Sequence, residues 1–229
     1  MRYFLICILL TGLVTSVAAG ETTAQRLKRA AEVVNAVMRA PDQSIPQGIL
    51  SKAVCVAVVP GYMKAAFGFG GSFGRGALVC RRGGTGPWGP PAMFTLGGPS
   101  IGFQIGGSSS DVVLVVMNGD GARKLLQSKV KLGVDAAVAG GPVGRKAEAS
   151  TDAFMHAEIL TYSRSRGAFA GVSLGGAIIK QDGDADRKLY GRKVNAQEIL
   201  FKNAVGVPAA ARPLDEALTK YSPHGGQKF

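Results

Sequence analysis

The chain is poor in the residues on which many enzyme sites depend. Histidine occurs only twice in 229 residues, as His156 and His224, which makes a Ser-His-Asp triad or a Cys-His dyad improbable. No CxxC pair supports a zinc knuckle or a thioredoxin-like motif. No two carboxylates are spaced in a way that indicates a glycosidase. The sequence therefore predicts a non-enzyme with no catalytic residue, metal site or cofactor.

One acidic motif resembles a calcium loop only in its opening spacing. Asp182, Asp184 and Asp186 alternate as the first ligands of such a loop do. Arg187 then stands where glycine is required, and Lys193 where a bidentate glutamate is required. We interpret this segment as a turn followed by a helix cap.

The chain also lacks an apolar run long enough to span a membrane at its N-terminus. Arg2 gives a short positive start, residues 3–14 are apolar, and residues 17–19 are small. This pattern is typical of a cleaved secretory signal peptide over residues 1–19, with an uncleaved N-terminal anchor as the alternative. We therefore expect an extracytoplasmic protein, periplasmic or secreted, that is soluble or peripheral on a membrane.

Acidic residues are scarce relative to basic ones. The chain has 27 Lys and Arg against 15 Asp and Glu, a net charge of +12. A protein with this balance is attracted to polyanions, and export favours anionic lipid head groups or surface polymers over nucleic acid. The alternative is a charged surface that only keeps an apolar chain soluble. The basic residues form small clusters: Arg81-Arg82, Arg123-Lys124, Arg145-Lys146, Arg164 with Arg166, Arg187-Lys188 and Arg192-Lys193.

Two cysteines, Cys55 and Cys80, remain after removal of the signal segment. Both lie in β-like runs, and an oxidising compartment would permit a disulfide between them. Two buried free thiols are the alternative, because cysteine often serves as a small core residue.

Periodicity indicates helices at both ends of the chain. Residues 21–40 form an amphipathic pattern, with Lys28 and Arg29 on its polar face, and Pro41 ends it. A short helix over residues 44–52 follows. Three more helices are expected at residues 182–190, 196–202 and 214–221.

The middle of the chain reads as β structure. An apolar strand covers residues 54–59, and short runs between residues 65 and 117 alternate with glycine-rich turns. Glycines inside these runs argue for strong curvature or close backbone approach. The predicted fold is α+β, with a strongly curved, mainly antiparallel sheet on which the terminal helices pack. We predict a helix in residues 20–43, one domain over residues 44–221, and a flexible tail over residues 222–229.

The segment Leu160–Ile179 joins a basic half to an apolar half. Residues 168–179 are expected to form a core strand, whereas Tyr162, Arg164 and Arg166 are candidates for anion binding. The glycine-flanked loop around Arg145 and Lys146 is a second candidate. The alternative is that these arginines pair internally, with the acids Glu148, Asp135 or Glu158.

Five motifs in a fixed order resemble the SYLF-domain family. They are SKAVCVAVVP at residues 51–60, GPSIGFQIGG at 98–107, SDVVLVVMN at 110–118, AGGPVGR at 139–145 and TYSRSRGAFAGVSLGGAII at 161–179. The similarity covers about residues 44–200 and points to an exported, bacterial-type member. The resemblance implies a lipid-binding α+β domain without catalytic residues. Eukaryotic members of the family are known for phosphoinositide binding and actin regulation.

The resemblance has two departures. Lys146 stands where the family commonly has Asn or Asp, and Gly175 where many members have an acidic or polar residue. These changes would make a pocket at those positions more positive and roomier. Because an exported protein does not meet the cytoskeleton, only lipid binding is carried over, and actin regulation is not.

The function expected from the sequence is therefore an extracytoplasmic module that binds anionic phospholipid. Arg145, Lys146, Arg164 and Arg166 would contact head groups. The helix over residues 21–40 either lies on the membrane with Lys28 and Arg29 at the head groups, or packs its apolar stripe on the sheet. The alternative function is a structural or partner-binding envelope protein without lipid selectivity.

Overall fold

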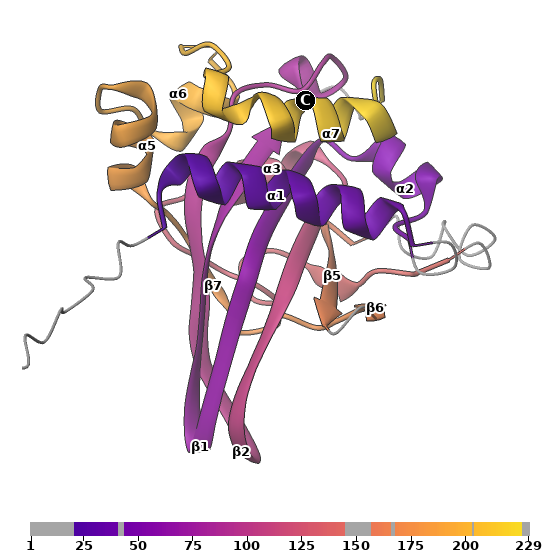
Figure 1. The fold of residues 1–229 in the computed structure, drawn as a ribbon, viewed down its shortest axis with the longest axis vertical. Coiled ribbons are helices and arrows are strands. Elements are labelled where there is room, and N and C mark those ends of the chain that lie inside the picture. The colour runs from indigo at the N-terminus through magenta and orange to yellow at the C-terminus, as the bar shows by residue number, and fades with distance from the viewer. Residues whose placement is uncertain (1–20, 41–43, 145–156, 166–167, 203, 226–229) are drawn as a thin grey trace, which may run out of the picture.

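The structure, a computed structural model, describes residues 21–40, 44–144, 157–165, 168–202 and 204–225. The predicted α+β fold is confirmed, with helices from both ends of the chain packed on a curled, mostly antiparallel sheet (Figure 1). The predicted signal segment lies outside the described residues.

The helices are α1 (Thr23–Met38), α2 (Gln47–Lys52), α3 (Gly119–Leu125), α5 (Gly183–Tyr190), α6 (Ala196–Leu200) and α7 (Arg212–Tyr221), with 3-10 turns η1 (Arg82–Gly84) and η3 (Ala209–Ala211). The strands are β1 (Cys55–Cys80), β2 (Ala92–Val116), β3 (Val130–Lys131), β4 (Val138–Gly140), β5 (Ile159–Ser165), β6 (Ala168–Gly171) and β7 (Ile178–Gln181).

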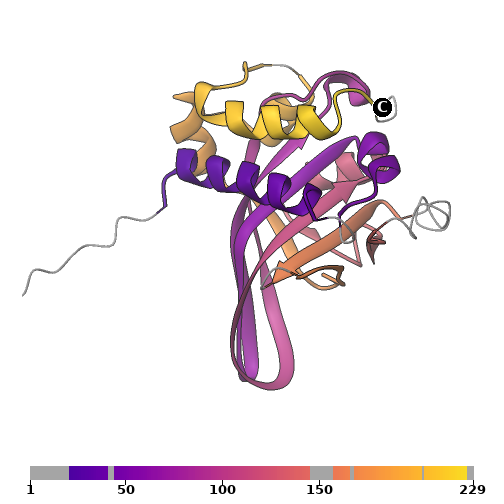
Figure 2. The same ribbon diagram turned by 45° about the vertical axis from the view of Figure 1, so that its right-hand side comes forward.

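Two long strands, β1 and β2, dominate the architecture. They pair antiparallel from Cys55–Val116 at one end to Leu78–Ala92 at the other. The prediction of several short strands in this region was wrong, because its internal glycines do not end the strands. We call the β1–β2 pair the folded ribbon, since it doubles back on itself away from the helices (Figure 2).

The register of the ribbon explains its bend. Between the pairs Ala66–Gly106 and Gly68–Gly102, β1 has one residue and β2 has three, so β2 follows the longer path. The unequal count disrupts the ladder locally and lets both strands turn together.

Glycines bring the two halves of the ribbon into contact. A Cβ on Gly76 would lie 2.3 Å from the carbonyl oxygen of Val58, and one on Gly74 would lie 2.5 Å from Val59 Cγ1. Only glycine permits this approach, which is the close packing that the sequence predicted for glycines inside strands. The Tyr62 hydroxyl also bonds to Ser72 Oγ across the two halves, at 2.7 Å.

The remaining strands extend both halves of the ribbon. β7 and then β3 continue from the first half of β2, whereas β5 pairs with its second half. β4 joins β5 in parallel, which makes the sheet mixed. One apolar core lies between the sheet halves, and a second lies beneath α1, α2 and α7.

Helix α1 confirms the amphipathic pattern read from residues 21–40. Thr22 and Gln25 form a capping box at its start. Its apolar stripe, including Leu27, Val34 and Val37, is buried against β1 and α7. Of the two alternatives, α1 therefore packs on the body, and its apolar face is not available to a membrane.

The segment Leu160–Ile179 is not one core strand after a basic strip. Its second half contains the short strand β6, a turn, and β7, and Ala168 and Ala170 are exposed. Among the side chains described in this half, those of Leu174, Ala177 and Ile179 are buried. The prediction was wrong because apolar residues and glycines alternate there in an exposed edge and turn.

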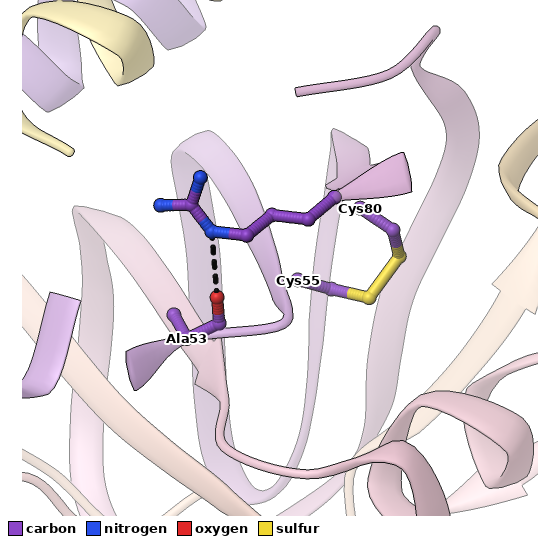
Figure 3. The surroundings of a disulfide bond; sticks show 4 residues. Ala53, Cys55 and Cys80 are labelled. Carbon is purple, nitrogen blue, oxygen red and sulfur yellow. Dashed lines mark hydrogen bonds between the residues drawn. A yellow bond between two sulfur atoms is a disulfide. The ribbon is translucent and has the colours of Figure 1, made fainter. Parts of the chain in front are cut away.

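The bend of the ribbon places Cys55 beside Cys80, and the two form a disulfide with an S–S distance of 2.01 Å (Figure 3). The bridge ties together the ends of β1. In the same region, the Ala53 carbonyl accepts a hydrogen bond from Arg81 Nε at 3.0 Å.

Arg81 is fully buried, although the sequence places it in a basic pair with the exposed Arg82. Its Nη2 donates to both the carbonyl and the hydroxyl of Ser222, at 2.9 and 2.6 Å, and its guanidinium lies 4.0 Å from the centre of the Trp88 ring. Burial lowers the pKa of Arg81 to about 10. Ser222 is 1% exposed, so the predicted flexible tail over residues 222–229 was wrong at its first residue.

Candidate anion-binding surface

Three of the predicted anion-binding residues, Arg145, Lys146 and Arg166, lie outside the described residues. Their roles stay predictions. Gly175, the other departure from the family pattern, lies on an exposed turn between β6 and β7.

Tyr162 is fully buried, which corrects its prediction as a head-group contact. Burial raises the pKa of its phenol above the ordinary value. A Cβ on Gly141 would lie 2.0 Å from Tyr162 Cζ, and one on Gly171 would lie 2.1 Å from the Gly141 carbonyl oxygen. These parts of the AGGPVGR and TYSRSRGAFAG motifs therefore pack against one another, and Tyr162 has a structural position.

Arg164 lies at the base of the folded ribbon, 34% exposed, with its Nη1 3.7 Å from Asp111 Oδ2. The other oxygen of Asp111 accepts the backbone N–H of Gly61 at 3.0 Å. Internal pairing of Arg164 is thus observed, but with Asp111. Of the acids proposed from the sequence, Glu158 pairs with Lys124.

The side chain of Arg29, on α1, extends to Gly61, next to Asp111. A Cβ on Gly61 would lie 2.8 Å from Arg29 Nη2, so the guanidinium rests against the glycine that bonds Asp111. Its Nη1 pairs with Glu21 at 2.9 Å, and half of the side chain stays exposed. The structure therefore brings Arg29 and Arg164 to the same Gly61–Asp111 contact, although they are far apart in the sequence.

Lys28, in contrast, lies away from the ribbon. It lines a groove of about 390 Å³ between α1 and α7, together with Glu32, Glu216 and Lys220. Two acids balance two bases there. The structure thus separates Lys28 from its neighbour Arg29.

The folded ribbon itself contributes basic residues that sequence reasoning missed. Lys64 and Arg75 are exposed on β1, with their charged groups 5.8 Å from the ring centres of Tyr62 and Phe73, respectively. Lys180 of β7 lies in the same row of the sheet as Arg75, because both residues pair with Thr95 of β2. Within the described ranges, Lys64, Arg75 and Lys180 form no ion pair.

The signal for this surface was present in the sequence. No Asp or Glu occurs between Asp42 and Asp111, a stretch that contains all of β1 and most of β2. Its charged residues are all basic: Lys52, Lys64, Arg75, Arg81 and Arg82. The ribbon is therefore a basic projection whose one acid, Asp111, lies near the end of β2.

A cleft of about 830 Å³ lies between β7, α5 and α6. Three basic and three acidic side chains line it, so its charge is balanced. They are Lys180, Arg187, Lys193, Asp182, Asp184 and Glu198. Asp182 caps α5 through the Ala185 N–H at 3.2 Å, as the sequence predicted for this acidic run.

Among the described residues, no group of three or more His, Cys, Asp and Glu side chains is placed to hold a metal ion. Within those same ranges, no helix is both long and apolar enough to cross a membrane.

The curled sheet, the terminal helices and the folded ribbon define the class as an α+β half-barrel with a basic, glycine-rich projection. Residues 97–221 match the family model described as "Ysc84: Las17-binding protein actin regulator". The chain belongs to this Ysc84/SYLF family, as its motifs indicated.

Curated relatives support the same assignment. The chain is 33% identical over 195 residues to Protein YSC84 of Saccharomyces cerevisiae, covering 82% of this chain and 41% of the relative. It is 34% identical over 184 residues to SH3 domain-containing YSC84-like protein 1 of Homo sapiens, covering 80% and 53%. An SH3 domain-containing protein of Schizosaccharomyces pombe is 34% identical over 177 residues, covering 76% and 40%. The chain thus spans about half the length of these relatives or less, and two of their names record an SH3 domain.

Proposed function

We propose that this protein is a non-catalytic, extracytoplasmic module that binds anionic phospholipid head groups through the basic side chains around its folded ribbon. The observation that carries the proposal is that Lys64 and Arg75 are exposed on the ribbon without an ion-pair partner among the described residues, on strands whose one acid is Asp111. A cation without a protein partner is available to a phosphate.

The base of the ribbon places two further guanidinium groups nearby, each paired with a carboxylate. Arg29 lies against Gly61 and Arg164 against Asp111, and their side chains remain half exposed and a third exposed, respectively. Each basic residue near an anionic surface contributes roughly 1 kcal/mol, so three or four contacts give useful affinity. Lys64, Arg75 and Lys180, which form no ion pair among the described residues, reach the lower of these numbers before the predicted contacts of the loop at residues 145–146.

Two features support an extracytoplasmic location. Residues 1–19 have the composition of a cleaved signal peptide. The Cys55–Cys80 disulfide is the kind of bond that persists in oxidising compartments.

Neutralising the ribbon cations tests the proposal. We expect Lys64→Gln with Arg75→Gln to weaken binding to phosphatidylglycerol-containing vesicles about 30-fold, the loss of roughly 2 kcal/mol from two contacts. Vesicle sedimentation over a range of lipid concentrations measures the change.

The matched control is Lys28→Gln with Lys220→Gln, the same change of charge in the groove between α1 and α7. It should leave the affinity within about twofold, because screening limits charges more than about 10 Å from the surface. Equal losses for the two pairs, or equal binding of the wild type to neutral vesicles, would refute a head-group site at the ribbon.

A protein partner is the second candidate. The names of relatives, such as LAS seventeen-binding protein 3 of Saccharomyces cerevisiae, favour it, and an envelope protein would be the corresponding partner here. A protein of this kind would show no lipid selectivity and would co-purify with one defined partner.

A further inference from the structure

A pocket of about 520 Å³ lies where the first turn of α1 meets α5 and the second half of β1. Figures 1 and 2 both show the N-terminal end of α1 beside α5. We call this cavity the α1–α5 pocket. Its basic lining residues come from all three elements: Arg26 from α1, Arg75 from β1 and Lys188 from α5. Segments that are far apart in the sequence therefore bring their cations to one cavity.

The acids that line the α1–α5 pocket are each paired with a basic side chain. These pairs are Glu21–Arg29, Asp184–Arg187 and Asp182–Arg26, at 2.9, 2.9 and 3.2 Å. Arg75 and Lys188, in contrast, form no ion pair within the part of the chain that the structure describes. The pocket therefore keeps the positive charges of Arg75 and Lys188, which no paired acid balances there.

Arg26 forms a buried part of the pocket wall, and its guanidinium is incompletely satisfied. The side chain is 3% exposed, and its Nη1 donates to Asp182 Oδ2 at 3.2 Å. Its Nε is buried and has no hydrogen-bond acceptor among the described residues, since Glu21 Oε2 lies 3.9 Å away. A buried charged donor is costly when it lacks an acceptor. An anion in the pocket would therefore stabilise this side chain.

The first turn of α1 adds backbone donors to the same pocket. Thr22 caps the helix by accepting the Gln25 N–H at 3.2 Å. The N–H groups of Thr23 and Ala24 have no intrahelical acceptor, because they belong to the first turn. That turn contains no acidic side chain, so the positive end of the helix dipole is not neutralised within it. Free N–H groups at such an end bind phosphate.

We propose that the α1–α5 pocket binds a terminal phosphate group, either free phosphate or the phosphomonoester of a lipid head group. Arg75 and Lys188 contact its oxygens, Arg26 donates from the wall, and the Thr23 N–H donates from the helix end. A phosphomonoester carries close to two negative charges at neutral pH, which matches the two cations without an acidic partner. This inference adds a discrete site to the proposed function and does not require it, because free phosphate has the same chemistry.

Titration with inorganic phosphate, followed by NMR of the ¹⁵N-labelled protein, tests the pocket directly. We expect saturable shifts of the Thr23 amide signal and of the Arg26 Nε–H signal. Sodium chloride at the same ionic strength should not produce them, because screening alone does not fill the donors. The two signals report on the helix end and on the buried guanidinium separately.

Substitutions around the pocket should change the phosphate affinity in both directions. We expect Lys188→Gln to weaken it about fivefold, and Arg26→Lys, which keeps the charge but loses the planar donor fork, about tenfold. Glu21→Gln removes the acid beside Arg26 Nε and should strengthen binding about threefold. Lys193→Gln is the matched control, with an effect below twofold, because Lys193 lines the neighbouring cleft and not this pocket. Thermal melting identifies any loss that comes from misfolding of the Arg26 variant, and the other variants do not depend on it.

Two vesicle compositions distinguish the source of the phosphate. Phosphatidic acid ends in a phosphomonoester, whereas the phosphate of phosphatidylglycerol is a diester. A preference for phosphatidic acid at equal surface charge, lost in Lys188→Gln, would assign the pocket to a lipid head group. Binding of inorganic phosphate without such a preference would assign it to the free ion. Either result supports the pocket.

The results that overturn the inference differ from those that refute the proposed function. Shifts that do not saturate, equal shifts with chloride, or equal effects of Lys188→Gln and Lys193→Gln would overturn the pocket. If the wild type then still binds phosphatidylglycerol vesicles, the proposed function stands. Saturable phosphate binding by a protein that does not bind those vesicles would keep the pocket and refute the proposed function.

Discussion

Replacing Arg81 by methionine is expected to lower the free energy of unfolding by about 3 kcal/mol or more. The Arg81 guanidinium donates to the carbonyls of Ala53, Gly86 and Ser222, at 3.0, 3.2 and 2.9 Å. Methionine keeps much of the volume but leaves these carbonyls without this donor, and each unsatisfied buried group costs about 1–3 kcal/mol. Urea denaturation measures the loss, which corresponds to about 6–12 °C in Tm for a protein of this size.

Arg82→Met is the matched control for this prediction. Arg82 follows Arg81 directly and is exposed, so its replacement should change stability by less than about 0.5 kcal/mol. Trp88 Nε1 also donates to the Ser222 carbonyl, at 3.0 Å, and retains part of the contact in the Arg81 variant. Equal stability of the two methionine variants would contradict the role of Arg81 as the link between β1 and the C-terminal helix.

The second large effect is a pH dependence that originates at Asp186. Its carboxylate is fully buried, accepts from the Met93 N–H and from Gln181 Nε2, both at 2.7 Å, and lies near Asp182 and Arg26. Burial raises the pKa of Asp186 from 3.8 to about 6, because the charged form loses its water. The folded state therefore binds this proton more tightly than the unfolded state does.

The sign of the effect follows from this difference. The stabilisation is fully present below pH 3.8 and is lost as the pH rises through about 6, by up to about 3 kcal/mol. We expect Asp186→Asn to remove this decrease from the urea midpoints measured between pH 4 and pH 7. Asp184→Asn, on an exposed neighbour of the same helix, should retain it. A wild-type profile that the Asp186 variant does not change would show that the group titrates normally.

Local chemistry allowed much of the fold to be predicted. The apolar period of residues 21–40 and the acidic cap at Asp182 depend on neighbours along the chain, and α1 and α5 form as expected. The long strands of the ribbon could not be predicted in the same way. A glycine is equally compatible with a turn between strands and with a bent or closely packed position inside one strand. Which of these holds for Gly76 depends on its contact with Val58, which the sequence does not show.

The site was less predictable because its charges depend on tertiary position. Arg81 and Arg82 are adjacent in the sequence, yet the first is buried and the second exposed. Tyr162 belongs to a polar, basic segment of the sequence, yet its side chain is buried and packs against Gly141. The absence of acids between residues 42 and 111 is visible in the sequence and predicts a basic surface on the ribbon.

Hydrogen–deuterium exchange with and without phosphatidylglycerol vesicles tests most directly whether the folded ribbon faces an anionic membrane. The account predicts slower exchange in residues 62–69 and 99–110, with α1 and α7 unchanged, and no slowing with neutral vesicles. Slower exchange on α1 and α7 with an unchanged ribbon would contradict it, as would the absence of any change with anionic lipid.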